Sequence, residues 1–424
     1  MLNHIGSMPK TIKLSNAYPN VILTAQWHRS LERNSKDEQT LGMNKKIGLA
    51  AAVILALGCI TAARYVSHSS TELEPSPIGR LKPNVDQPSN TFENRLKPVP
   101  ELVLRSDTAK LAFVPHHHLQ LSRLEALAAP MRDQQEKGPS GLWKLTNFYY
   151  GLRDQINLSF HWPEDENNFN SVFAEWESLN PNKSSSPYIA KAYVLRKLLD
   201  RAMYDAYEAA KSGKPTAELQ ARVNDRNTQL FAFLNASKQI AQNDPGFYLV
   251  YIASLGKLCM PFEKVYEVLE EGSIKFPNFH QLYFEALSVG MECQDDDRFQ
   301  VVLKKIVDLG IARTQAVDGQ AMYARTMWYL SSLIGDAAFS NEVVVWSRMK
   351  QGMYDVLKRY PDAWNVNNFA RFACVAHDAQ TARDLLPKAL ELPVLEVWKT
   401  TKNFDACRSW AMSTANSDLP AVTK

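Results

Sequence analysis

The stretch that decides the fold is residues 244–277, DPGFYLVYIASLGKLCMPFEKVYEVLEEGSIKFP. Its apolar residues recur every three or four positions, which is the spacing of one helix face. Pro245 and Pro277 bound the stretch, and Pro261 separates its two amphipathic segments. Residues 244–277 therefore predict two short antiparallel helices joined by a tight turn.

A second pair of the same kind follows Tyr360-Pro361, with segments 367–376 and 380–390. Both pairs have the length and layout of a tetratricopeptide-like repeat, although neither meets the strict consensus. Neither helix of such a pair buries its apolar face alone, so the pairs stack and the stack curves around a concave surface. We therefore expect a superhelix of stacked antiparallel helix pairs.

Helical spacing of apolar residues continues through most of the chain, and no run of alternating apolar and polar residues interrupts it. It predicts helices over residues 119–135, 142–152, 168–179, 187–211, 217–242, 247–258, 262–275, 281–293, 298–308, 320–333, 343–359, 366–376, 381–390 and 405–412. We therefore expect one all-α domain over residues 105–416, followed by a short tail at 417–424.

One apolar run, residues 47–63, lies outside this domain and reads IGLAAAVILALGCITAA. A membrane-spanning helix needs about 20 apolar residues and the core of a signal peptide needs fewer, so the run fits either one. We favour a signal-anchor over residues 43–66, because Tyr65-Val66 extend the apolar stretch. Cleavage after Ala63 is one alternative. Lipidation at Cys59 is another, although the lipobox at 55–59 is imperfect.

The flanks of this run predict the topology. Lys45 and Lys46 precede it, and positive charges keep their side of a membrane helix in the cytoplasm. We therefore expect a single pass through a bacterial inner membrane, with everything after Arg64 in the periplasm. Residues 67–104 are rich in Pro, Ser and Asn and predict a semi-extended tether.

Residues 1–42 show no apolar periodicity and predict a disordered extension. Met43-Asn44-Lys45-Lys46 is a usual start for a bacterial export signal, so Met43 competes with Met1 as the first translated residue.

Composition argues against one class of partner. The chain has 48 Lys and Arg and 45 Asp and Glu, for a net charge of +3, and no basic block. Phosphate binding needs clustered cations, so we expect no nucleic acid partner. Aromatic residues make up 10% of the chain, but most of them recur at helical spacing and predict core packing.

No motif for nucleotide binding, metal-dependent proteolysis or a nucleophilic serine is found, so we expect no cofactor and no metal. The acidic runs 164–166 and 295–297 lack the spacing of a calcium loop, and we interpret them as charges that complement helix starts. The histidine run 116–118 cannot place all three side chains on one metal, so we interpret it as a solvated turn.

Several phrases of the domain are distinctive. They are Gly141-Leu142-Trp143-Lys144-Leu145, Met322-Tyr323-Ala324-Arg325, Trp346-Ser347-Arg348-Met349-Lys350, and the longest, Arg359-Tyr360-Pro361-Asp362-Ala363-Trp364-Asn365 with Asn368-Phe369-Ala370-Arg371-Phe372-Ala373-Cys374. Over roughly residues 119–412 they resemble a bacterial family known as domain of unknown function 4034. A Trp-Gly-Gly feature of that family is missing from residues 284–302. The resemblance implies a tetratricopeptide-like fold and no known activity.

Two functions remain open. The first is a non-catalytic module whose concave groove binds another envelope protein or a peptide, as the repeats and the absence of a catalytic motif indicate. The second is an envelope hydrolase or lyase with carboxylates from separate helices. Glu175 beside Trp176 and Asp378 after His377 are its candidate participants.

The first helix of each pair usually lines the concave face of such a stack. On that rule Tyr251, Tyr283, Arg325 and Arg371 are candidate groove residues, with core packing or solvent exposure as the alternative for each.

The cysteines of the domain form two pairs of nearly equal spacing, Cys259 with Cys293 and Cys374 with Cys407. The spacing is about one helix pair, so partners can lie at similar heights on neighbouring helices. Disulfides persist in an oxidising periplasm. Buried free thiols are the alternative.

Overall fold

The computed structural model describes residues 92, 95–112, 120–159, 164–180, 183–340 and 343–417. All of them belong to one unit of the chain, which begins at Thr91. They form helices and no β-strand, apart from an isolated bridge between Lys137 and Trp143. The predicted all-α domain is confirmed for these residues.

The helices have the following bounds: α3 Pro100–Leu111, α4 Leu121–Asp133, α5 Lys144–Ser159, α6 Glu164–Leu179, α7 Ser185–Lys211, α8 Ala217–Ala241, α9 Pro245–Lys257, α10 Phe262–Lys275, α11 Gln281–Cys293, α12 Asp296–Asp318, α13 Ala321–Ile334, α14 Ala337–Ser340, α15 Trp346–Arg359, α16 Ala363–Val375, α17 Ala379–Glu391, α18 Leu395–Trp398 and α19 Thr401–Ser417.

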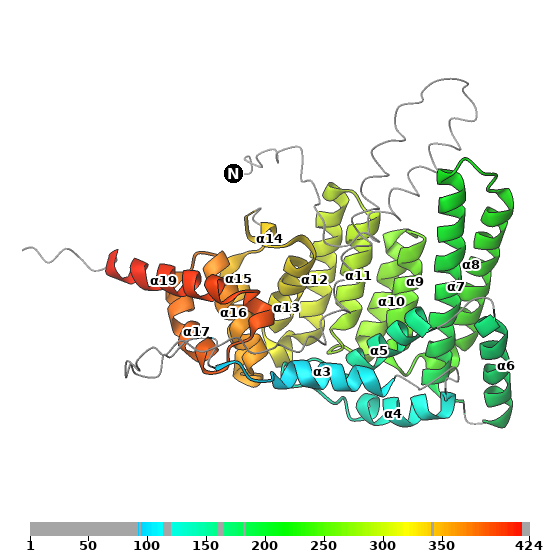
Figure 1. The fold of residues 1–424 in the computed structure, drawn as a ribbon, viewed down its shortest axis with the longest axis horizontal. Helices are drawn as coiled ribbons and strands as arrows, with labels where there is room; N and C mark the ends of the chain where they lie inside the picture. The colour runs from blue at the N-terminus through cyan, green and yellow to red at the C-terminus, as the bar shows by residue number, and fades with distance from the viewer. Residues whose placement is uncertain are drawn as a thin grey trace, which may run out of the picture. The chain divides into compact units, whose positions relative to one another are not determined.

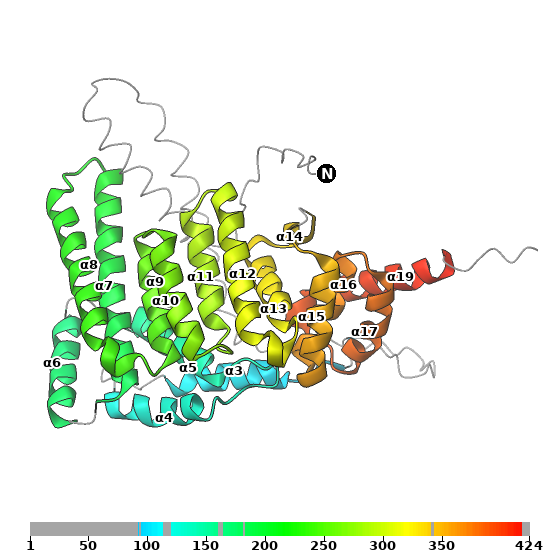
Figure 2. The same ribbon diagram turned by 180° about the vertical axis from the view of Figure 1, so that it is seen from behind.

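Helices α7 to α13 stand side by side in a row, and α15 to α17 continue it (Figures 1 and 2). Most of them pack against the next helix and against the next but one, as α9 does with α10 and α11, and α11 with α12 and α13. This pattern arises because each short helix is apolar on more than one side and needs two neighbours to bury that surface.

Helix α9 shows how the sequence sets the bounds of these helices. Asp244 caps its start, since Oδ1 accepts a hydrogen bond from the Gly246 backbone N–H at 2.8 Å, and Pro245 occupies the first turn, where no N–H is needed. The helix ends at Lys257, and Cys259 in the turn that follows has a left-handed φ of 44°. Helix α16 repeats the plan with Asp362 as its cap and His377, with a φ of 57°, in the turn that follows.

Helix α12 is about twice as long as the predicted helix 298–308, which stopped short of Gly310. That glycine lies inside the helix, where a Cβ would approach the Met322 side chain to 2.9 Å. Gly310 therefore permits the close packing of α12 on α13 rather than ending the helix.

An N-terminal strap, defined here as Phe92, α3, the loop 134–143 and α5, runs along the row of helices. Phe92 packs on Phe404 with ring centroids 4.9 Å apart, and the Arg105 guanidinium lies 4.8 Å from the Trp364 ring. α3 and α5 approach closely, since a Cβ on Gly151 would overlap the Ala109 backbone. The predicted tether therefore ends earlier than residue 104, because Pro100 is the first residue of α3.

Further along, the strap reaches earlier helices. Trp143 packs edge-on against Phe279 at 5.4 Å, and the Tyr149 hydroxyl donates to Asp244 at 2.6 Å. The strap thus runs opposite to the row, from α19 back to α9.

Several predictions lie outside the described residues. They concern the apolar run 47–63, the extension 1–42, most of the tether and the histidine run 116–118. Among the helices that the structure describes, none combines the length and the apolar character needed to cross a membrane.

Candidate functional site

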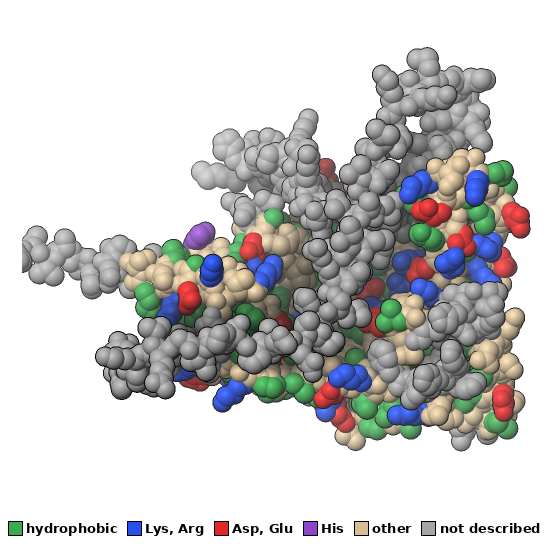
Figure 3. Space-filling model, in the orientation of Figure 1, with side chains coloured by type: hydrophobic (Ala, Val, Ile, Leu, Met, Phe, Trp, Pro, Cys, Tyr) green, Lys and Arg blue, Asp and Glu red, His purple; other side chains and the backbone are tan. Residues whose placement is uncertain are grey.

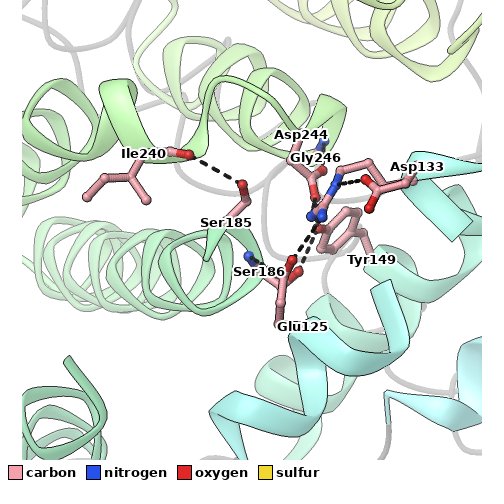
Figure 4. Close-up of polar contacts among 9 residues, drawn as sticks. Glu125, Asp133, Tyr149, Ser185, Ser186, Ile240, Asp244 and Gly246 are labelled. Carbon is pink, nitrogen blue, oxygen red and sulfur yellow. Dashed lines mark hydrogen bonds and ion pairs between the residues drawn. The ribbon is translucent and has the colours of Figure 1, made fainter. Parts of the chain in front are cut away.

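A buried polar junction joins α4, α5, α7 and α9 (Figure 4). Asp244 lies at its centre with no exposed surface. Its Oδ2 accepts hydrogen bonds from the Tyr149 hydroxyl at 2.6 Å and from Arg132 Nη1 at 3.1 Å, while Oδ1 caps α9. No side chain fits at Gly246, because a Cβ there would overlap the Tyr149 ring.

Glu125 completes the junction. It accepts from Arg132 Nη2 at 2.9 Å and from the Ser186 backbone N–H at 3.0 Å. The charge of each carboxylate therefore meets the Arg132 guanidinium and further donors, which offsets the cost of burying it. A fully paired arrangement of this kind is built for stability and leaves nothing for a ligand to satisfy.

A second polar region has a different character. We call it the polar strip, and it comprises Tyr150 and Arg153 on α5, Tyr193, Arg196 and Asp200 on α7, Lys257 on α9, Glu285, Ser288 and Glu292 on α11, and Tyr329 on α13. The members on α7 and on α11 follow one another at three- and four-residue steps, so each set occupies one helix face.

Distances and electrostatic effects show that these faces meet. Lys257 Nζ lies 3.2 Å from Asp200 Oδ1, which joins α9 to α7. The Tyr329 hydroxyl lies 2.7 Å from Ser288 Oγ, which joins α13 to α11. Burial, followed by the nearby negative charge of Glu285, raises the pKa of the Tyr150 hydroxyl well above its ordinary value.

Glu292 is the most perturbed carboxyl of the strip. Burial raises its pKa to about 7, and the negative charge of Glu285 adds to the effect. Lys257 and Arg196 oppose the shift without cancelling it. Near neutral pH the protonated carboxyl, which can donate a hydrogen bond, and the ionised carboxylate are therefore both populated.

Several charged groups of the strip lack direct partners. Among the described residues, Glu285 and Glu292 form no hydrogen bond or ion pair. The Nε of Arg196 is buried and has no hydrogen-bond partner in the described part of the chain. Unpaired groups of both signs on a half-buried surface are suited to bind a ligand that carries complementary charges and polar atoms.

The structure corrects two of the predicted groove residues. Tyr283 is fully buried, with its hydroxyl donating to the Pro277 carbonyl at 3.1 Å, so it belongs to the core. Arg325 is 4% exposed and donates to the Ser140 carbonyl of the strap at 2.6 Å. The strap itself therefore occupies the surface that Arg325 was expected to present to a partner.

The other two predicted groove residues are partly exposed but lie outside the strip. The Tyr251 hydroxyl donates to Asn235 Oδ1 at 2.9 Å, which turns the ring toward α8. Arg371 pairs with Asp336 at 2.5 Å. Neither is linked to the strip by a described contact.

The candidate participants of a hydrolase or lyase are not brought together. Glu175 is exposed, and Trp176 packs within an aromatic cluster beside Phe173 and Tyr188. Asp378 caps α17 and accepts from Trp346 Nε1 and Lys350 Nζ, both at 2.9 Å. Burial disfavours its ionised form, but hydrogen bonds from Thr381, Lys350 and Trp346 outweigh burial and hold its pKa well below the ordinary value.

Among the described residues no group of three potential metal ligands converges. Asp295 caps α12 by accepting from the Arg298 backbone N–H at 2.9 Å, as its interpretation as a helix-start charge requires. On the face shown in Figure 3, Lys and Arg alternate with Asp and Glu over α7 and α8.

The structure pairs the four cysteines of the domain as predicted from their spacing. Cys259 and Cys293 have a Cα–Cα distance of 5.1 Å, and Cys374 and Cys407 one of 5.8 Å. Both distances lie within the range that disulfide geometry allows. The first pair joins the turn after α9 to the end of α11, and the second joins α16 to α19.

The polar strip is not among the sites predicted from the sequence. A signal was present in α11, where Glu285, Ser288 and Glu292 place polar groups along one face of an otherwise apolar helix. What the sequence could not show is that α5 places Tyr150 and Arg153 opposite that face.

Comparison with family models, curated proteins and solved structures gives no match to this chain. The similarity to domain of unknown function 4034 therefore remains a prediction from sequence phrases.

Proposed function

We propose that this protein is a membrane-anchored envelope component whose helical stack, a tetratricopeptide-like superhelix, binds an extended segment of another protein along the polar strip. The single observation that carries the proposal is the set of unpaired charges in the strip. Glu285, Glu292 and Arg196 lie half-buried without hydrogen-bonded partners among the described residues. An extended peptide offers backbone donors and acceptors together with side-chain charges, which would satisfy such groups.

The location is part of the same proposal. The apolar run 47–63 behind Lys45 and Lys46 supports a single-pass anchor in a bacterial inner membrane, with the domain in the periplasm. Two cysteine pairs at bonding geometry support an oxidising compartment. Membership of domain of unknown function 4034 is proposed on the quoted phrases, and it adds no activity.

The test is photo-crosslinking in intact cells, with a photoreactive residue at position 288 in the strip. We expect a reproducible protein adduct that is lost with the double variant Arg196→Met, Glu285→Gln. The matched control is Arg201→Met, because Arg201 lies on the same helix but is exposed and paired with Asp205. An adduct that survives the double variant, or the lack of any adduct, would overturn the proposed binding.

A second candidate function rests on Glu292 and Glu285. A carboxyl with a pKa near 7 beside another carboxyl can act as a general acid, as in enzymes that cleave glycosidic bonds. Seven residues on a helix, however, separate the two by about 10 Å along the axis, which is long for such a pair. This geometry favours binding over hydrolysis.

The enzymatic alternative has its own measurement. Purified protein incubated with cell-wall glycan would release soluble fragments, and Glu292→Gln would reduce the rate by about 100-fold or more. No release above that of the Glu292→Gln variant would exclude the alternative.

A further inference from the structure

A small pocket lies where the loop 134–143 of the strap meets α11, α13 and the end of α15. Its polar lining comes from Lys137, His280, Asp318, Arg325, Asp355, Arg359 and Tyr360. It has room for about one water-sized particle. The proposed partner-binding function makes no use of it.

Arg325 is the buried cation of this pocket. Its Nη2 donates to the Ser140 carbonyl, and its guanidinium carbon lies 5.9 Å from the Tyr360 ring centre. No carboxylate of the described chain lies within ion-pair distance of it. Burial lowers the pKa of this guanidinium to about 10, which still leaves it charged at neutral pH. Asp318, which also lines the pocket, raises the pKa of Arg325 only from a distance, so the buried guanidinium has no direct counter-charge.

His280 supplies a second unsatisfied group. The residue is buried, and its Nδ1 has no hydrogen-bond partner among the described residues. Burial, with the charges of Arg325 and Lys137, holds its pKa well below the ordinary value, so the ring is neutral. In the tautomer with the proton on Nδ1, this atom donates a hydrogen bond into the pocket.

Lys137 is the third donor. Its ammonium group lies 3.2 Å from the Tyr360 hydroxyl and forms no ion pair within the described chain. The acidic side chains nearby are already engaged. Asp318 pairs with Arg359 at 2.6 Å, and Asp355 accepts from the Gln320 backbone N–H at 2.8 Å. The pocket lining therefore carries three cations, Lys137, Arg325 and Arg359, against the two carboxylates of Asp318 and Asp355, which leaves one positive charge in excess.

We propose that this pocket binds a single chloride ion, held by Arg325, Lys137 and the Nδ1–H of His280. The size of the space excludes sulfate, phosphate and organic acids, whereas a monatomic anion fits after a small adjustment. Lys137 belongs to the strap, while His280 and Arg325 belong to the helical row. The bound ion thus fastens the strap to the row.

Thermal unfolding of the full-length protein tests the proposal. Tm is measured as chloride replaces gluconate at constant ionic strength, because gluconate is too large for the pocket. We expect Tm to rise by a few degrees with chloride and with bromide, since a ligand that binds only the folded state stabilises it. Lys137→Met should abolish the rise. Lys144→Met is the matched control, because Lys144 follows the same loop but pairs with Glu136.

Crystals grown in bromide provide the second measurement. An anomalous peak within hydrogen-bond distance of Arg325 and His280 is expected. Equal Tm values in chloride and gluconate, or a bromide-free pocket occupied by an ordinary water, would overturn the proposal. Retention of the chloride effect in Lys137→Met would also contradict it.

Discussion

The polar junction and the polar strip are built on the same helices and have opposite characters. Adjacent residues of α5 point into them, Tyr149 into the junction and Tyr150 into the strip. Helix α9 begins in the junction at its cap Asp244 and ends in the strip at Lys257. In the junction the charges are paired, whereas in the strip Glu285 and Glu292 are not.

The two regions separate stability from binding: the paired groups at the start of α9 stabilise the fold, and the unpaired groups near its end are the ones proposed to bind. Completing every hydrogen bond at one end of α9 fixes the positions of α4, α5 and α7. That rigid end permits the other end to carry unpaired charges, which lower stability but remain open to a ligand.

The largest loss in the free energy of unfolding is expected for a substitution in the junction. Asp244→Ala removes the cap of α9 and leaves Arg132 and Tyr149 without their shared acceptor in a buried site. We expect a loss of about 3–5 kcal/mol in the free energy of unfolding, measured by urea denaturation. The control is Asp295→Ala, which removes an exposed cap and should cost about 1 kcal/mol. Equal losses for the two variants would show that the junction adds nothing beyond capping.

The next effect concerns the bond between the ends of α9 and α11. Cys259→Ser opens a bridge between residues 34 positions apart, and we expect it to cost about 3 kcal/mol, mainly through the unfolded state. Urea denaturation measures the loss, and a reducing agent should cause a larger loss in the unmodified protein, because it also opens the bridge between Cys374 and Cys407. Alkylation of all four of Cys259, Cys293, Cys374 and Cys407 in the unfolded, unreduced protein would show instead that neither bridge forms.

In the strip, the substitution of Glu292 is expected to increase the free energy of unfolding, by less than the losses above. Glu292 in the folded protein keeps its proton up to about pH 7, whereas its ordinary pKa is 4.5. Between these values the folded state binds more protons than the unfolded state, so this residue lowers stability as the pH rises. Glu292→Gln removes that loss and should stabilise the protein by about 1–2 kcal/mol at pH 8 and by almost nothing at pH 4.

Thermal melts of the two proteins across this pH range measure the difference. The isosteric control is Glu267→Gln, because Glu267 is an exposed residue of α10 paired with Lys264. If Glu292→Gln is destabilising at pH 8, the carboxylate has a partner in the folded protein and the strip is part of the structural framework.

The smallest effect is expected at a residue outside both regions. Tyr251→Phe removes an exposed hydrogen bond to Asn235 and should change the free energy of unfolding by less than about 0.5 kcal/mol. Crosslinking through position 288 should be unchanged. A loss of the crosslink would instead indicate that Tyr251 takes part in binding the partner.

The helix pair in residues 244–277 could be predicted closely, because its caps, prolines and apolar spacing are all local signals. The structure has α9 at Pro245–Lys257 and α10 at Phe262–Lys275, against predicted helices at 247–258 and 262–275. Helix α3 was missed because Pro98 and Pro100 read as a tether, although a proline at the first helical position is favourable.

The candidate site could be predicted far less well. The rule that first helices line the groove gave Arg325, but it could not show that the strap would cover this residue with Ser140. The junction and the strip both depend on contacts between α5 and helices formed much later in the chain. Such contacts leave no periodic trace in the sequence, because only the tertiary fold brings the residues together.

The strap also has a consequence for the order in which the protein folds. An ordinary repeat stack folds through neighbouring contacts and can grow as it is synthesised. Here Arg95 bonds to the Leu390 carbonyl, across 295 residues, and Asn365 bonds to the Ser140 carbonyl, across 225. The strap, which is synthesised first, therefore cannot form these hydrogen bonds until the last helices of the domain have been synthesised. Contacts over such distances slow folding and make the row of helices unfold as one cooperative body rather than from its ends.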